Sequence, residues 1–546
     1  MFLRRKIVRQ SGKEYVYWQL VENERRNGKV RQKVICTVGR EDEMDRDRVD
    51  KMVAALASQT HKLQVLDLEK DLILKHTREY GALVVLQRLW DELGIGDEIR
   101  RQIRDRAFTF DVEAAIRGMV FNRLLDPFSD RGTYDWLVND ADFPEAKSLS
   151  LHHLYRALDV LHEYKEPIEE GLFLRMRDLF SLDVSLVFYD ATLIRSYGRE
   201  SELIQYGRDG ELEFLLTLAN SREGLPFAHE VEPGATADVT TVEKMVNALQ
   251  RRFHVTHCIF VGDRGMLSEE NLELLREAGI HYIVGCPLRR AGEVRDIVLA
   301  WPGRYREVAE NLRVKEVRVE DRRYIVCFNP IEAEYDRQTR ESIVEELRAE
   351  LEGLDPWSRE AARLYSHPGK GRYLMRLDDG RICLDEARIR EEARYDGKYV
   401  IRTSYEQLDS AEVARAYRDL QTIERSFRSL KSLEEINPVY HWRERRIRAH
   451  VHVCVLAHLL ERYLEKKLHA KGIKMTAAEA LKHLSRIKSA YIEIKGAMYR
   501  LRSEASPEAV TIFQALGYRI PPRIEPLAKD DRDAKTEASR AQNALV

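Results

Sequence analysis

The sequence has few cysteines and few of the residues that interrupt helices and strands. Its 546 residues include six cysteines, 28 glycines and 15 prolines. The cysteines lie far apart and form no CxxC pair, which argues against a structural zinc site or a dense disulfide framework. The low glycine and proline content excludes a collagen-like or low-complexity chain. We therefore expect globular domains with free, buried thiols.

Long hydrophobic runs and an excess of charge of one sign are also missing. The apolar run 451–460 is ten residues long and contains two histidines, so it is too short and too polar to span a bilayer. The N-terminal MFLRRKIVRQ has no apolar segment behind its basic residues, so we expect no signal peptide and a cytoplasmic protein without a membrane partner. With 90 Lys and Arg against 92 Asp and Glu, any nucleic-acid contact must come from local patches.

The sequence contains enough apolar residues for several domains. Hydrophobic residues make up 44% of the chain, and at about 100–200 residues per domain the length corresponds to roughly three to five domains or subdomains. Strand-like runs fill 1–42, with Asn27-Gly28 as a hairpin signal. Apolar residues at three- and four-residue spacing predict helices from 76 to 180. We predict a β-rich segment and linker over 1–75 and a helical domain over 76–180.

The pattern changes to alternating strands and helices over 181–285. The order is β, β, β, α, β, α, β, which is that of the ribonuclease-H-like fold, where the first and fourth strands are parallel neighbours. Asp190 and Asp263 end these two strands, 184–190 and 257–263, so their carboxylates are expected to lie close together. Close carboxylates repel each other, which a hard divalent cation such as Mg²⁺ or Mn²⁺ relieves. The alternative is a pair of strand-end acids that cap helices or meet solvent.

The alternation stops after residue 285. The segment 286–405 has scattered strand candidates and one long charged helix, so we predict an inserted α+β domain that does not continue a doubly wound sheet. A single helix is expected from Ser410 to about residue 432, and 406–505 would complete the core with further helices. We expect 506–546 to be a partly disordered C-terminal segment, because the tail from Pro526 has almost no large apolar residues.

The expected helix from Ser410 carries a third acid. Tyr417, Glu424 and Lys431 are seven residues apart and would share one stripe of it, with Arg428 nearby. A carboxylate beside a phenol and two cations suits a metal ion next to a phosphodiester, whereas the alternative is a solvated charged helix face. Seven Lys or Arg against three Glu over 425–449 favour a DNA surface with salt-sensitive phosphate contacts.

Together these motifs resemble the DDE transposases of bacterial insertion sequences. The resemblance rests on YDATLI around Asp190, FVGDRGMLSEENL around Asp263 and Y-(6)-E-(6)-K around Glu424, and it covers most of 180–460. The more similar branch has an inserted domain before the Glu and a Y-(2)-R-(3)-E-(6)-K helix. Here Leu420 stands where that branch has Arg, and the adjacent Arg418 is expected to face elsewhere on the helix.

The resemblance implies an α/β multidomain enzyme with a ribonuclease-H-like catalytic core interrupted by the insertion. It implies a Mg²⁺-dependent (or Mn²⁺-dependent) DNA transposase, nuclease and strand transferase, that cleaves and joins insertion-sequence ends with two metal ions. The implied catalytic residues and metal ligands are Asp190, Asp263 and Glu424. The implied DNA-binding residues are Tyr417, Arg425, Arg428 and Lys431.

The implied partner is double-stranded DNA. It would be bound as transposon terminal inverted repeats, by the helical 76–180, and as chromosomal or plasmid target DNA, with a homodimer on paired ends. Two alternatives stay open at this point: a transposase-derived DNA-binding protein without catalysis, and a structure-specific metal-dependent endonuclease on the same core.

Overall fold

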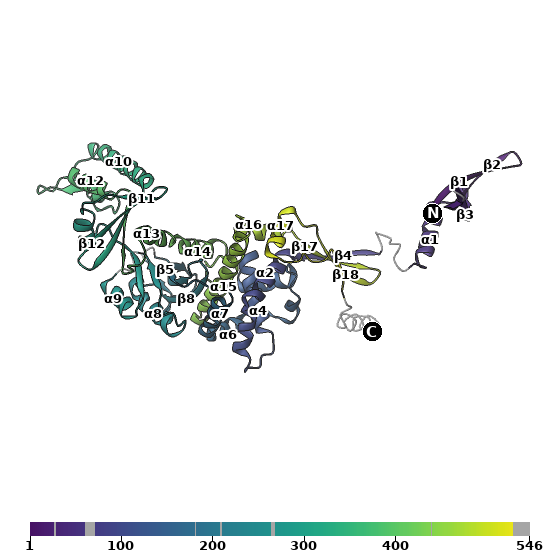
Figure 1. The fold of residues 1–546 in the computed structure, drawn as a ribbon, viewed down its shortest axis with the longest axis horizontal. Coiled ribbons are helices and arrows are strands. Elements are labelled where there is room, and N and C mark those ends of the chain that lie inside the picture. The colour runs from purple at the N-terminus through teal and green to yellow at the C-terminus, as the bar shows by residue number, and fades with distance from the viewer. Residues whose placement is uncertain are drawn as a thin grey trace. The chain divides into compact units, whose positions relative to one another are not determined.

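The computed structural model describes residues 1–26, 29–60, 71–180, 182–207, 210–263, 268–437 and 439–527 (Figure 1). The chain divides into two compact units, a mixed α/β architecture. The smaller unit contains Met1–His76, Ala490–Leu501 and the chain from Ile524, and the larger unit contains Thr77–Ser489 and Arg502–Arg523.

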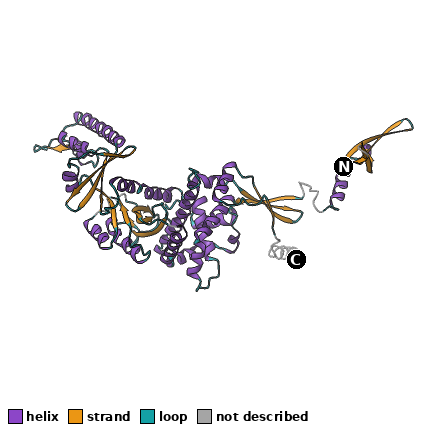
Figure 2. Cartoon of the chain, viewed as in Figure 1, coloured by secondary structure: helices purple, strands orange, loops and turns teal. Residues whose placement is uncertain are grey.

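The smaller unit is rich in strands (Figure 2). Its strands are β1 (Phe2–Gln10), β2 (Lys13–Arg26), β3 (Lys29–Arg40), β4 (Leu72–Glu79), β17 (Lys488–Ile494), β18 (Ala497–Arg502) and β19 (Ile524–Pro526). Three of them, β4, β17 and β18, begin or end in the larger unit. β1, β2 and β3 form an antiparallel sheet, and the other four pair in the order β19–β18–β17–β4. Ser11 and Gly12 make the β1–β2 turn at positive φ. Helix α1 (Arg46–Ala57) begins after Asp45, whose carboxylate accepts a hydrogen bond from the Arg48 backbone N–H. The expected hairpin at Asn27-Gly28 and the expected disordered tail after 527 lie outside the described residues.

Helices form one layer of the larger unit. They are α2 (Gly81–Leu93), α3 (Ile95–Ile103), α4 (Val112–Leu125), α5 (Asp130–Asn139), α6 (Leu151–Glu163), α7 (Lys165–Phe180), α15 (Glu444–His469), α16 (Ala477–Leu484) and α17 (Pro507–Leu516). α15 contacts α2, α4 and α6 and is buried on most sides, which accounts for the apolar run 451–460 as a core helix. Among the described residues, no helix combines the length and apolar character needed to cross a bilayer.

The central sheet lies next to this helical layer. Its first strands are β5 (Leu186–Arg195), β6 (Gln205–Tyr206), β7 (Leu212–Asn220), β8 (Pro226–Pro233), β9 (Ile259–Gly262) and β10 (His281–Cys286). β5 pairs with β9, and β9 with β10, in parallel, whereas β7 is antiparallel to both β5 and β8. The predicted parallel pairing of 184–190 with 257–263 is therefore present. Helices α8 (Asp238–Arg251) and α9 (Glu269–Glu277) connect β8 to β9 and β9 to β10.

The segment after β10 does not continue the alternation of parallel strands and helices, but its antiparallel strands extend the central sheet, which the sequence did not predict. It contains β11 (Arg306–Ala309), β12 (Leu312–Val319), β13 (Arg322–Phe328), α10 (Pro330–Glu352), α11 (Arg359–Ser366), β14 (Leu374–Arg376), β15 (Ile382–Leu384), α12 (Glu386–Glu392) and β16 (Lys398–Thr403). β16 is antiparallel to β10 on one side and β13 on the other, so the described sheet reaches ten strands. The physical reason is that the edge of β10 would otherwise expose unpaired backbone groups. β14, β15 and the helices around them share a small separate core.

Two further helices cover the central sheet (Figure 1), the first against β10, β12 and β13 and the second against β5. They are α13 (Ser410–Arg418) and α14 (Gln421–Ser432). Apolar residues of both helices pack in one layer with the central strands. These helices lie over the strands that lead to Asp190 and Asp263.

Candidate active site

The first two predicted acids, Asp190 and Asp263, lie at neighbouring positions of the central sheet. Tyr189 on β5 pairs with Gly262 on the parallel β9, and Asp190 and Asp263 are the next residues. Adjacent strands are about 4.8 Å apart, so the two acids lie side by side. Asp263 follows the end of β9 as predicted, but Asp190 lies inside β5, opposite Leu218 of β7, and does not end its strand, because β5 continues to pair with β7 as far as Arg195. Both acids are partly buried.

The alternation of the strands decides which way these acids face. Phe188 and Val261, two residues before Asp190 and Asp263, pack in the layer that contains Ile423 of α14. Residues two apart on a strand share a face of the sheet. The fold therefore turns both acids towards α13 and α14, from which the third acid comes.

The helix that carries Glu424 differs from the expected single helix. The chain bends between α13 and α14, where Leu420 N donates to Tyr417 O at 3.1 Å and Ile423 N donates to Leu420 O at 2.9 Å. These bonds span three residues instead of four, as in a tighter 3₁₀ turn. Leu420 is buried in the apolar layer, so packing against the sheet fixes the bend. Asp409, not Ser410, caps α13 through its side chain.

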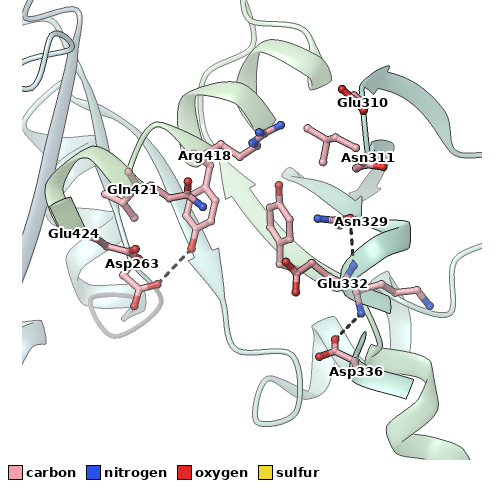
Figure 3. A pocket seen from close by; sticks show the side chains of 15 residues that line it. Asp263, Glu310, Asn311, Asn329, Glu332, Asp336, Arg418, Gln421 and Glu424 are labelled. Carbon is pink, nitrogen blue, oxygen red and sulfur yellow. Dashed lines mark hydrogen bonds between the residues drawn. The ribbon is translucent and has the colours of Figure 1, made fainter. Parts of the chain in front are cut away.

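A cavity of about 550 Å³ opens beside these residues. Its lining includes Asp263, Tyr417, Arg418, Gln421 and Glu424. Figure 3 shows Asp263 and Glu424 together at one end, with Glu332 and Asp336 from α10 at the other. Arg418 also lines the cavity, but Figure 3 shows its side chain directed away from Asp263 and Glu424.

Tyr417 is held against the second acid. Its hydroxyl donates a hydrogen bond to Asp263 Oδ1 at 3.3 Å. Its ring stacks on Tyr399 of β16, with ring centroids 5.9 Å apart. Tyr417 therefore orients the Asp263 carboxylate within the protein, in addition to any contact with a bound molecule.

Polar contacts fasten α14 to the strands. Asn220 Nδ2 donates to Ser426 Oγ at 3.0 Å in the buried layer. Lys431 Nζ donates to Thr192 Oγ1 at 2.7 Å, two residues beyond Asp190 on β5. Burial lowers the pKa of Lys431, and the charge of Arg195 lowers it further. Lys431 therefore lies beside the strand that carries the first acid.

The predicted residues are thus only partly gathered in one cavity. The described lining contains Asp263, Glu424 and Tyr417, and it does not include Asp190, Arg425, Arg428 or Lys431. Asp190 lies on the neighbouring strand at the position next to Asp263. Arg425 and Arg428 are exposed on α14.

A buried charged cluster behind α14 was not anticipated from the sequence. His458 Nδ1 of α15 lies 2.7 Å from Glu461 Oε2 and 3.3 Å from Glu434 Oε1. Ser429 of α14 donates to Glu461 Oε1 at 3.0 Å. Glu434 and His458 are fully buried. The cluster joins the end of α14 to the core helix α15, and only their spatial contact could reveal it.

The protonation of this cluster follows from its burial and its charges. Burial alone would lower the pKa of His458, but its hydrogen bonds to Glu434 and Glu461 outweigh this and raise the pKa to about 9. Burial raises the pKa of Glu434 to about 7 despite the neighbouring imidazolium. The three ligand atoms lie within 4.8 Å of one another. A protonated imidazole between two carboxylates donates hydrogen bonds to them, so we interpret this group as a structural ion-pair cluster.

The solved structures that the chain is similar to include two transposase complexes. The piggyBac transposase synaptic complex with hairpin DNA has 9% sequence identity and a TM-score of 0.36, over 75% of this chain and 82% of that chain. The Mos1 transposase paired-end complex with left transposon end has 11% identity and a TM-score of 0.14, over 34% of this chain and 57% of that chain. TM-scores this low do not establish a shared fold. No curated protein matches the chain.

Family models give the decisive comparison. The model of the transposase DDE domain matches residues 185–460, which is half of the chain and contains all three acids. The model of the IS1634 family transposase N-terminal domain matches residues 3–64. The sequence motifs, the neighbouring acids and these matches agree, and the chain belongs to the DDE transposases of insertion sequences.

Proposed function

We propose that this transposase cleaves and joins the DNA ends of its insertion sequence with two divalent metal ions, Mg²⁺ or Mn²⁺, held by Asp190, Asp263 and Glu424. The observation that carries the proposal is the position of the acids. Asp263 and Glu424 line one cavity, and Asp190 occupies the adjacent position on the parallel strand. The strand order β8–β7–β5–β9–β10, with its parallel β5–β9 pair, supports a ribonuclease-H-like core.

The donor set fits hard cations. Three carboxylates provide oxygen ligands of the kind that Mg²⁺ and Mn²⁺ prefer. Tyr417 occupies only Asp263 Oδ1 with its hydrogen bond, so Oδ2 is available to a ligand on that count. A bound metal pair would activate the attacking oxygen and stabilise the leaving 3′-oxygen of an in-line displacement.

The remaining side chains would bind and orient DNA. Lys431 beside β5, Arg418 in the cavity and the exposed Arg425 and Arg428 supply positive charge around the acids. Contacts from such side chains to phosphates position the duplex without reading its sequence. In this proposal the DNA is the terminal inverted repeat and later the target, bound by a homodimer on paired ends, with the helical 76–180 taking part in end binding.

Removal of the metal tests the proposal directly. We expect the purified protein to nick a labelled duplex carrying the flanking terminal repeat in Mg²⁺ or Mn²⁺, and to lose this activity in EDTA, because the carboxylates cannot activate the nucleophile without cations. The measurement is a denaturing gel, with metal restored after EDTA as the control. Cleavage that persists in EDTA contradicts the proposal. Joining of cut ends to a target plasmid distinguishes it from a structure-specific endonuclease.

Substitution of Arg418 is a second test of the proposal, because it removes one of the side chains proposed to bind DNA. We expect Arg418→Gln to weaken binding of the terminal-repeat duplex by about tenfold and to reduce the slope of log affinity against log salt by about 1, because one phosphate contact is lost. Fluorescence anisotropy at several salt concentrations measures both quantities. Arg415→Gln is the matched control, since Arg415 is exposed on the same helix and is not among the described cavity residues. Equal effects of the two substitutions would mean that Arg418 makes no specific contact with the DNA.

A further inference from the structure

Three large aromatic side chains are exposed together beyond the end of β5. Tyr197, Tyr440 and Trp442 have relative exposures of 72%, 67% and 64%. Side chains of this size bury large areas in most folds, and a group of them at the surface is typical of a binding site. We call these three residues the aromatic shelf.

The shelf is built from two segments that are fastened together. Tyr197 N donates to Val439 O at 2.9 Å, and Ser196 Oγ donates to the same oxygen at 3.3 Å. The rings of Tyr197 and Tyr440 stack with centroids 5.9 Å apart and an angle of 18° between their planes. The two tyrosines therefore present one rigid surface, although they are far apart in the sequence.

Val439 and His441, which alternate with Tyr440 and Trp442 along the chain, determine the orientation of these two aromatic side chains. Val439 is 1% exposed, and His441 Nε2 lies 3.1 Å from Asp130 Oδ2 at the start of α5. In an extended segment alternate side chains point in opposite directions. Because Val439 and His441 are anchored inside, Tyr440 and Trp442 must point outward. Their exposure is therefore enforced by the fold.

Positively charged side chains lie along β5 between the candidate active site and the shelf. Tyr197 is seven residues after Asp190, which corresponds to at most about 23 Å at the rise of a strand and to about seven nucleotides of one DNA strand. Between them lie Lys431, held on Thr192, and the exposed Arg195. At the far end, Arg443 Cζ lies 4.9 Å from the Trp442 ring centroid.

Acidic side chains only partly offset this charge. Glu211 pairs with Arg195 at 3.0 Å, and Glu444 Oε1 accepts a hydrogen bond from the Leu203 backbone. Glu200 is exposed near the shelf, as is Arg199. The cations between the candidate active site and the shelf thus favour the binding of an anionic polymer over that of an acidic or apolar protein.

We propose that the aromatic shelf binds unpaired nucleobases of the DNA strand that leaves the active site, by stacking on Tyr197, Tyr440 and Trp442, with Arg443 contacting the backbone. Every base has a flat π-face, so such a site accepts unpaired bases without reading their sequence. The inference rests on the proposed function, because it takes the acids as the place where DNA is cut.

Binding of a fluorescein-labelled oligothymidylate to the full chain in EDTA tests this inference without catalysis. We expect Tyr440→Ala and Trp442→Ala each to weaken binding by about tenfold, and Tyr440→Phe and Trp442→Phe to stay within about twofold of the unaltered protein, because phenylalanine still stacks. Tyr335→Ala is the matched control, since Tyr335 on α10 is also 67% exposed, and it should leave binding unchanged. Circular dichroism verifies that each variant is folded.

Three results would overturn the stacking site. The alanine variants could bind the oligothymidylate as tightly as the unaltered protein. The phenylalanine variants could lose as much binding affinity as the alanine variants. Finally, the substitutions could change only the sedimentation coefficient of the protein, which would indicate a protein–protein surface. Metal-dependent cleavage by the unaltered protein is measured separately. If cleavage occurs while the shelf variants bind normally, only the stacking site fails; if cleavage is absent while the variants lose binding, only the proposed chemistry fails.

Discussion

Replacing Glu424 by Gln is expected to reduce metal-dependent cleavage of terminal-repeat DNA by at least about 10³-fold, and Asp190→Ala and Asp263→Ala should do the same. Each substitution removes an anionic oxygen ligand from the proposed metal pair, and a loss of several kcal/mol of transition-state stabilisation corresponds to a factor of this size. Glu424→Gln keeps the size of the side chain, and Glu424 is exposed, so the variant should fold and bind DNA normally. Single-turnover cleavage rates and duplex binding are the two measurements.

The matched control for these variants lies in the same cavity. Glu332 on α10 is at the other end of the lining, away from Asp263 and Glu424 (Figure 3). Glu332→Gln removes a carboxylate of the same kind and should change the cleavage rate by less than about threefold, because a surface substitution away from the chemistry has small effects. Cleavage that survives in any of the three acid variants would exclude that acid from catalysis. An equal loss in Glu332→Gln would mean that the whole cavity, and not the three acids, governs the rate.

Replacing His458 by Ala should destabilise the larger unit by about 3–5 kcal/mol, because removal of one partner from a buried ion pair leaves an uncompensated charge. Here two buried carboxylates, Glu434 and Glu461, would lose the imidazolium between them. Urea denaturation followed by circular dichroism measures the change. His469→Ala is the control, since His469 is exposed at the end of the same helix and should change stability by less than about 0.5 kcal/mol.

A second substitution separates charge from packing in this cluster. Adding Glu434→Gln to His458→Ala removes one of the stranded carboxylates and should recover part of the lost stability. No recovery would mean that the loss comes from the cavity left by the imidazole.

The pH dependence of the unaltered protein follows from the same cluster. The folded-state pKa of His458 is raised from 6.5 to about 9, so its stabilising contribution is complete below pH 6.5 and disappears as the pH rises through 9. Glu434, raised from 4.5 to about 7, acts in the same direction, because its ionised form is the one that burial disfavours. Stability should therefore fall as the pH rises from 4.5 to about 7 through Glu434, and from 6.5 to about 9 through His458. The part between pH 7 and 9 should be absent in His458→Ala.

Local sequence patterns determined much of this protein. Strand and helix periodicities are local properties of a sequence. They predicted the hydrophobic strands that contain or precede Asp190 and Asp263, the helix between those strands, and the apolar segment 451–460. The three acids could be selected because each stands at a definite position of such an element, and the family match over 185–460 confirmed the transposase prediction. Their role as metal ligands stays a prediction.

The tertiary structure decided what depends on contacts between distant segments. The bend at Leu420 comes from its packing under α14 and divides the single helix that periodicity predicted into α13 and α14. β16 joins β10 because an open strand edge needs a partner, so the sheet extends into 286–405. The Glu434–His458–Glu461 cluster and the aromatic shelf each join residues from separate elements. Sequence determines the period and the polarity of each element, whereas long-range packing decides which side chains meet.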